Sequence, residues 1–255
     1  MLLVLIYDVK TAGNLLRSSL ALSQNLKKEF GILRYVENDN PEHESQSAIN
    51  RYLQAENIAD AKIFITTDSE TDLALKCEYL EVSFLMIQWN GTNKTLKNCL
   101  KYCRDLRIPY LFFKSSFPEL NLDKVMVPVG FLVEEYEKAQ FASAFGRFCN
   151  SEITLLQAND YGSKAAVTIE KMKLVFDKFQ FNYIHEKATS DSYKLDKEAV
   201  RRAEKANYGI VIVSASRDYG LDDWIFGAKE SHLIKQSNVP LLLINPRSDL
   251  YTLCD

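Results

Sequence analysis

Glycine is scarce in this sequence. Nine of the 255 residues are glycine, which is roughly half the average share of about 7%. Loops that bind phosphate through backbone N–H groups usually need glycine, because a side chain keeps the backbone away from the anion. The composition therefore counts against a phosphate-binding loop.

Long apolar runs and an excess of basic residues are also missing. No run approaches the roughly 18 apolar residues of a membrane span, and the first run ends at Asp8, too early for a secretory signal. The 31 basic and 34 acidic residues leave a net charge of −3, so a broad cationic surface for nucleic acid is lacking. We expect neither a membrane nor a nucleic acid as partner.

Histidine motifs for metal binding and paired cysteine motifs are also absent. The three histidines lie far apart in the sequence and form no metal-ligand motif. The five cysteines are odd in number and show no C-x-x-C spacing. This usage predicts a reduced, cytoplasmic setting without a metal centre.

Short apolar runs alternate with longer amphipathic stretches, which is typical of βαβ units and a parallel sheet. Strands are expected at 2–7, 32–37, 62–66, 82–88 and 109–113 in the first half, and at 124–129, 152–158, 182–186, 210–214 and 240–244 in the second. Helices are expected at 14–30, 44–55, 70–80 and 94–107, and then at 134–149, 163–178, 191–206 and 223–236. The fold class is α/β.

The second half repeats the first. The run IPYLFF at 108–113 corresponds to VPLLLI at 239–244, each after an amphipathic stretch, so an internal duplication is predicted. Proline is tolerated at the first residue of a strand or at a sheet edge, which places both final strands at edges. We predict domains at 1–114 and 124–255, joined by a linker at 115–123, whose apolar edges meet in an intramolecular pseudo-dimer.

Residues 124–245 resemble the universal stress protein (UspA-like) family in its tandem form. KVMVPVGFLVEEYEKAQFASAFGRF is similar to the family's opening strand and first helix, and YGIVIVSASRDYGLDDWIFGAKESHLIKQSNVPLLLINP to its fourth strand, phosphate loop, fourth helix and last strand. The first half is similar by pattern and position only. The resemblance implies two Rossmann-like domains with strand order 3-2-1-4-5, dimerisation through the last strand and, in one subgroup, ATP at the strand ends.

That ATP-binding subgroup has an aspartate closing strand 1 and a G-x2-G-x9-G-[ST] phosphate motif. In the second half Gly130 stands at the aspartate position, and Ser214, Arg217, Gly227 and Ala228 stand where Gly, Gly, Gly and Ser/Thr are expected. One residue of the four is kept. Arg217 could still contact an anion, and Ser214 or Ser216 could donate a hydrogen bond.

The first half keeps the carboxylate at Asp8 and loses the loop. Pro109 follows Gln88 by 21 positions, whereas Pro240 follows Ser214 by 26. Asp8 is interpreted either as a ribose contact or as a hydrogen-bonded carboxylate at a strand end. Trp89 has two interpretations, an aromatic wall for a ligand and a packing residue at a helix start. The acidic residues at 134–137 fall in the first turns of a helix, where carboxylates favour the helix dipole.

The sequence therefore predicts a non-catalytic, cytoplasmic, universal-stress-type protein that acts by binding or association. Its nucleotide sites are expected to be vestigial, with Asp8, Ser214, Ser216, Arg217 and Gly227 as the remaining candidates. No cofactor is expected. The alternative is an adenine-nucleotide-binding sensor or weak ATPase that holds ATP with a noncanonical loop, 214–228. A more remote class is a nucleotide binder of the electron-transfer flavoprotein type. The partner is an unknown protein or small ligand, and the chain is expected to be a monomer with pseudo-dimeric halves or a weak homodimer.

Overall fold

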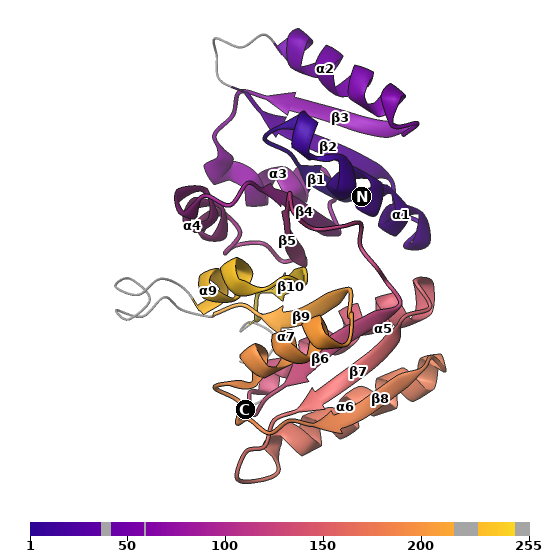
Figure 1. The fold of residues 1–255 in the computed structure, drawn as a ribbon, viewed down its shortest axis with the longest axis vertical. Coiled ribbons are helices and arrows are strands. Elements are labelled where there is room, and N and C mark those ends of the chain that lie inside the picture. The colour runs from indigo at the N-terminus through magenta and orange to yellow at the C-terminus, as the bar shows by residue number, and fades with distance from the viewer. Residues whose placement is uncertain (37–41, 59, 217–228, 248–255) are drawn as a thin grey trace. The chain divides into compact units, whose positions relative to one another are not determined.

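The computed structural model describes residues 1–36, 42–58, 60–216 and 229–247. The chain divides into two compact units, Met1–Leu120 and Asn121–Asp255. In each unit strands and helices alternate along the chain (Figure 1). None of the helices within the described ranges is both long enough and apolar enough to span a bilayer.

Unit 1 is a five-stranded parallel sheet with helices between the strands. Its strands are β1 (Leu2–Leu5), β2 (Phe30–Tyr35), β3 (Ala61–Thr66), β4 (Phe84–Trp89) and β5 (Tyr110–Lys114). Its helices are α1 (Gly13–Asn25), α2 (Glu42–Ala55), α3 (Leu73–Tyr79) and α4 (Asn93–Tyr102), with short 3-10 turns η1 (Val9–Thr11) and η2 (Glu70–Asp72). The strand order is β3-β2-β1-β4-β5.

Unit 2 repeats this topology. Its strands are β6 (Lys124–Val129), β7 (Glu152–Gln157), β8 (Tyr183–Lys187), β9 (Ile210–Ser214) and β10 (Leu241–Ile244). Its helices are α5 (Lys138–Phe148), α6 (Lys164–Phe179), α7 (Leu195–Lys205) and α9 (Lys229–Gln236), and the 3-10 turn η3 (Val133–Glu137) precedes α5. The order β10-β9-β6-β7-β8 is again parallel. The predicted α/β class and the strand order 3-2-1-4-5 are confirmed in both units, whereas the pairing of the two sheet edges stays a prediction.

The segment after β5 is attached to α1. The Asn14 side chain donates to the Phe117 carbonyl at 2.8 Å, and Ser18 Oγ accepts from Leu120 N at 2.9 Å. Phe117 is itself buried and packs edge-on against Phe113. Residues up to 120 thus belong to the packing of unit 1, while the domain limits of 114 and 124 stay predictions.

Several helices end in a left-handed residue that is not glycine. Backbone φ lies between 51° and 57° at residues that follow the ends of six helices, namely Lys27, Asn57, Glu81, Asn150, Gln180 and Asn207. Glycine is the usual residue at this position because it lacks a Cβ. The expected helix 14–30 is therefore too long: α1 ends at Asn25, Lys27 turns the chain, and Phe30 begins β2.

The two central strands of each sheet define where a site can form. In unit 2 the chain leaves β6 toward β7 on one side, and β9 lies on its other side. Ligands of open parallel sheets bind outside the carboxyl ends of the strands at this point of reversal. The corresponding strands in unit 1 are β1 and β4.

Candidate functional site

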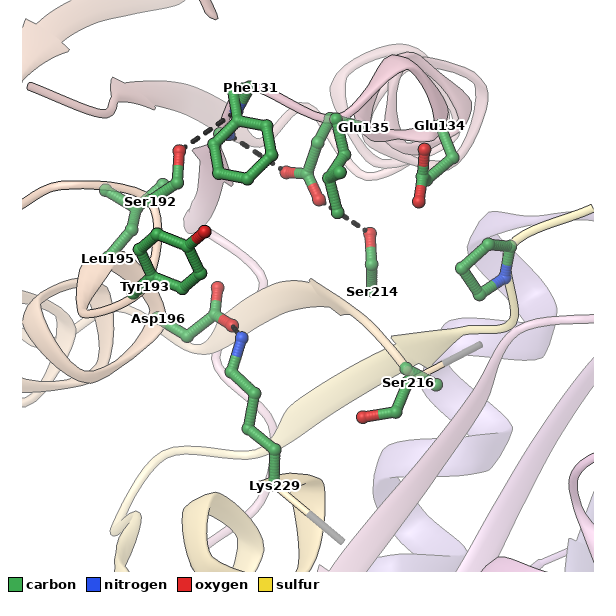
Figure 2. Close-up of a pocket in the computed structure, with 14 residues that line it drawn as sticks. Phe131, Glu134, Glu135, Ser192, Tyr193, Leu195, Asp196, Ser214, Ser216 and Lys229 are labelled. Atoms are coloured by element: carbon green, nitrogen blue, oxygen red, sulfur yellow. Dashed lines mark hydrogen bonds and ion pairs between the residues drawn. The ribbon is translucent and has the colours of Figure 1, made fainter. Parts of the chain in front are cut away.

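A pocket of about 470 Å³ lies at the carboxyl ends of β6 and β9 in unit 2. Figure 2 shows its lining, which comes from the segment after β6, the start of α7, the end of β9 and the start of α9. The lining residues are Gly130, Phe131, Leu132, Glu134, Glu135, Ser192, Tyr193, Leu195, Asp196, Ser214, Ala215, Ser216, Lys229 and Pro246.

Pro128 explains why β6 and β9 separate at this place. Gly209 N, just before β9, donates to the Lys124 carbonyl, and Ala158 N, just after β7, donates to the Val129 carbonyl. The backbone N–H and C=O groups of even-numbered β6 residues therefore point toward β9, and those of odd-numbered residues toward β7. Proline has no N–H to donate. The β6–β9 register accordingly runs only through Val125↔Ile210 and Met126↔Val211.

A buried lysine donates a hydrogen bond to the backbone carbonyl of Pro128. The Lys138 ammonium donates to the Pro128 carbonyl at 2.7 Å and to Glu135 Oε2 at 2.7 Å. Lys138 is 1% exposed and Glu135 is 7% exposed. A charge this deeply buried needs a partner of opposite sign, and the i,i+3 spacing of the two residues provides it.

Glu135 connects both central strands. Its Oε2 also accepts from Gly130 N at 3.1 Å, and its Oε1 accepts from the Ser214 hydroxyl at 3.1 Å (Figure 2). A carboxylate therefore stands at the end of the first strand of unit 2, although the residue at that end is glycine. It comes from η3, five residues further along the chain.

Gly130 is required here by close packing. A Cβ at this position would lie 2.7 Å from Ser192 Oγ and 3.1 Å from Ser192 Cβ. Ser192 is held in place, because its hydroxyl and its backbone N–H both bind the Asp160 carboxylate and its Oγ accepts from Phe131 N at 2.9 Å. An aspartate side chain at residue 130 would collide with this network.

One wall of the pocket is aromatic. The rings of Phe131 and Tyr193 meet edge to face with centroids 5.7 Å apart. Tyr193 is 78% exposed, so its ring covers the opening rather than the core. Leu132, at 45% exposure, extends the apolar rim.

An ion pair joins the starts of α7 and α9. Lys229 Nζ lies 2.5 Å from Asp196 Oδ2. Burial lowers the pKa of Lys229, but the charges of Asp196, Glu135 and Glu230 outweigh it, and the net shift is upward. Lys229 therefore stays protonated, and it is the one cation among the described residues that line the pocket.

The matching place in unit 1 is occupied by a side chain. Gln88 Oε1 accepts from Tyr7 N at 2.7 Å and Asp8 N at 2.9 Å, and its Nε2 donates to the Asp8 carbonyl at 2.8 Å and Thr11 Oγ1 at 3.0 Å. Asp8 caps η1: Oδ1 accepts from Lys10 N at 3.0 Å and Oδ2 from Thr11 Oγ1 at 3.1 Å. The Asp8 carboxylate is thus hydrogen-bonded at a strand end, which was one of the two interpretations of this residue.

The structure thus brings together only some of the candidate residues. Ser214 and Ser216 both line the pocket of unit 2, whereas Asp8 lies in unit 1. Arg217 and Gly227 lie outside the described residues. Trp89 is buried at the end of β4, where its Nε1 donates to the Thr92 carbonyl at 3.0 Å, as a packing residue does. Among the residues that the structure describes, no group of three or more His, Cys, Asp or Glu side chains could hold a metal.

Sequence reasoning missed both ion pairs of the site, Glu135 with Lys138 and Asp196 with Lys229. The Glu-x-x-Lys spacing of 135 and 138 was a usable signal for an ion pair. The acidic run was instead attributed to a helix dipole. The pair of Asp196 and Lys229 has no local signal, because 33 positions separate the two residues.

Solved structures with the same architecture include a universal stress protein from Archaeoglobus fulgidus DSM 4304. It aligns with a TM-score of 0.69 at 14% identity, over 96% of this chain and 98% of that chain. A putative universal stress protein from Pseudomonas aeruginosa UCBPP-PA14 aligns with a TM-score of 0.62 at 13% identity, over 99% and 95%.

A functionally unknown protein from Pseudomonas aeruginosa PAO1 gives a TM-score of 0.60 at 12% identity, over 99% and 94%. Scans of the sequence against protein-family models and against curated proteins give no match. At these identities the likeness concerns the fold. The chain has the fold of a tandem universal stress protein, as the resemblance of residues 124–245 indicated.

Proposed function

We propose that this chain is a non-catalytic binding protein of the universal-stress type, which takes a small ligand in the unit 2 pocket and no longer recognises nucleoside phosphates. The observation that carries this proposal is the Glu135 carboxylate, which is fixed between Gly130 N and Ser214 Oγ at the strand ends. Anion recognition needs free N–H donors at such a place. Here a carboxylate has taken the N–H of Gly130.

The charges around the pocket support the same proposal. Glu134, Glu135 and Asp196 line it, and Lys229 is already paired with Asp196. Negative charges a few ångströms from a phosphate repel it strongly at the effective dielectric constant of a protein. The vestigial character of the site, the cytoplasmic location and the monomeric state belong to this proposal and rest on the sequence.

Calorimetric titration of the full chain tests the proposal. ATP, ADP and AMP should show no saturable binding tighter than the high micromolar range. Replacing Glu134 by Gln removes a repelling charge and should strengthen any residual ATP binding, while Glu170→Gln on α6, an exposed carboxylate outside the pocket lining, should change nothing. A tight titration with one equivalent of ATP would contradict the proposal.

The second candidate is an adenine-nucleotide-binding sensor or weak ATPase that uses the segment 214–228. The observation in its favour is that Ser214, Ser216 and the Lys229 ammonium line one pocket. If it holds, Arg217→Ala should weaken ATP binding more than about tenfold, the scale of one charge-assisted hydrogen bond. Unchanged affinity in that variant would reject this candidate.

A further inference from the structure

The wall chemistry of the unit 2 pocket specifies a ligand class. Three of its described lining side chains are carboxylates, Glu134, Glu135 and Asp196, and one is a cation, Lys229. The side chains bonded directly to the lining add Lys138 behind Glu135, Asp160 behind Ser192 and Glu230 behind Ser216. The described lining and the described side chains bonded to it thus contain five carboxylates and two ammonium groups.

This excess persists when Arg247 is counted with the bases. Arg247 follows the lining residue Pro246, and its backbone N–H donates to Glu137 Oε1. Among the described residues, these five carboxylates still outnumber the three cations by two. An excess of negative charge raises the pKa of a nearby ammonium group. The pKa of Lys229 is raised in this way by the charges of Asp196, Glu135 and Glu230.

Glu135 retains capacity for a further donor. Within the described residues its Oε1 accepts one hydrogen bond, from Ser214, and a carboxylate oxygen accepts two. Figure 2 shows this carboxylate and the pair of Asp196 and Lys229 on opposite sides of one space, with the Tyr193 ring beside them. An N–H donor placed in that space would complete the shell of Glu135.

The aromatic wall provides a place for the ring of such a ligand. Aromatic side chains such as Phe131 and Tyr193 pack favourably against other rings in offset or edge-to-face arrangements. Tyr193 is mostly exposed at the opening, where a ligand ring would cover it. A carboxylate at the inner end and aromatic rings at the outer end match a molecule with an ammonium group on one side and a ring on the other.

We propose that the unit 2 pocket binds an organic monocation, an arylalkylamine that directs its ammonium group to Glu135 and its ring to Phe131 and Tyr193. This inference rests on the proposed function, because it uses the same pocket and the same exclusion of phosphates. It adds the sign of the ligand charge and the position of its ring.

Three probes of nearly equal shape test the charge preference. Tyramine carries an ammonium group at pH 7, tyrosol a hydroxyl in its place, and 4-hydroxyphenylacetate a carboxylate. Calorimetry on the full chain should show tyramine binding at least about tenfold tighter than tyrosol, which is the scale of one charge-assisted hydrogen bond. The carboxylate probe should not saturate.

Variants then locate the contacts. Glu135→Gln should bring tyramine down to the affinity of tyrosol, and Glu170→Gln is the matched control. Because Glu135→Gln leaves Lys138 buried beside a neutral amide, its fold requires a check, and Tyr193→Leu provides a second, independent variant at an exposed position. Tyr193→Leu should weaken tyramine about fivefold through loss of the contact between its ring and the tyramine ring.

The outcomes separate this inference from the proposed function. Equal binding of tyramine and tyrosol, tighter binding of the carboxylate, no binding of any probe, or full affinity in the Tyr193→Leu chain overturns the inference and leaves the proposed function in place. Saturable ATP binding tighter than the high micromolar range overturns the proposed function, whether or not tyramine displaces the ATP.

Discussion

At the scale of single residues, the site depends on one buried ion pair. Lys138 donates to the Pro128 carbonyl, and Glu135 neutralises Lys138 while it accepts from Gly130 N and the Ser214 hydroxyl. A buried pair adds little net stability when both partners are present, but removing one partner leaves a charge without compensation. Removal of either partner should therefore both displace the Glu135 carboxylate in the pocket and lower the stability of the surrounding structure.

Lys138→Met tests this dependence. We expect the free energy of unfolding to fall by about 3–5 kcal/mol, because Glu135 is left buried without its cation. Lys173→Met is the matched control, since Lys173 also pairs with a glutamate at i−3, Glu170, but Lys173 is only half-buried and Glu170 is exposed. The loss in this variant should be under about 1 kcal/mol. Urea denaturation measures both, and equal losses would show that burial of the first pair is unimportant.

The residue scale also shows where sequence reasoning stopped. Ser214 was found because a motif aligned it, Ser216 because it lies within that motif, and both line the pocket. Glu135 was visible in the acidic run, yet its role depends on η3, which turns its carboxylate back to Gly130. No spacing rule predicts such a return contact. Ser192 against Gly130 is likewise a contact between residues 62 positions apart.

At the scale of helices and strands, the apolar runs located every strand well and several helix ends poorly. A short apolar run in the sequence indicates a strand, and at 210–214 the predicted and observed bounds of the strand coincide. Helix ends are usually marked by glycine, and this chain places other residues there. The expected helix 14–30 continued past Asn25 because Lys27 carries no helix-stop signal, although it adopts φ 53°.

Glycine at such a helix end should stabilise the protein. Gln180 closes α6 with φ 55° and ψ 41°, a conformation that is unfavourable for a residue with a Cβ. Gln180→Gly removes this strain but frees the unfolded chain, so we expect a net gain of about 0.5–1 kcal/mol.

Asn207→Gly at the end of α7 is the comparison, because asparagine tolerates the left-handed region and φ there is 54°. Its effect should be near zero. Thermal denaturation of the two variants against the parent chain checks the difference, and a loss of stability in Gln180→Gly would refute the account.

At the scale of the whole molecule, acid stability is expected to depend on one carboxylate in the first turn of α7. Burial raises the pKa of Glu198, but hydrogen bonds from Thr189 and Ser190, together with Arg202, outweigh this and hold the pKa at about 2. The folded pKa is thus depressed below the model value of 4.5. The stabilisation is present above about pH 4.5 and is lost as the pH falls toward 2.

Glu198→Gln tests this linkage. At pH 7 the variant should be less stable by about 2–4 kcal/mol, from a shift of between two and three pKa units. The difference from the parent chain should narrow as the pH falls from 5 to 3, because Glu198 then becomes protonated in the unfolded parent chain while it stays ionised in the folded one. Denaturation curves at pH 7, 5, 4 and 3 provide the measurement, and a constant difference would contradict it.

The whole chain also shows the limit of inference from a duplicated pattern. Repeated runs and the resemblance predicted two units of one topology, and the structure has them. They could not predict that the two strand ends would be filled differently, by Gln88 in unit 1 and by Glu135 with Lys138 in unit 2. Side chains from distant elements decide this, and a topological repeat does not constrain them.

Gln88 has a consequence for how the protein responds to its ligand. Its amide uses both of its polar atoms to bind Tyr7, Asp8 and Thr11 after β1, so a molecule entering there would have to displace four hydrogen bonds. If the unit 2 pocket binds a ligand as proposed, this end of unit 1 should not bind a second copy. We then expect one equivalent of ligand per chain and a simple hyperbolic saturation curve, without cooperativity between the two strand-end sites.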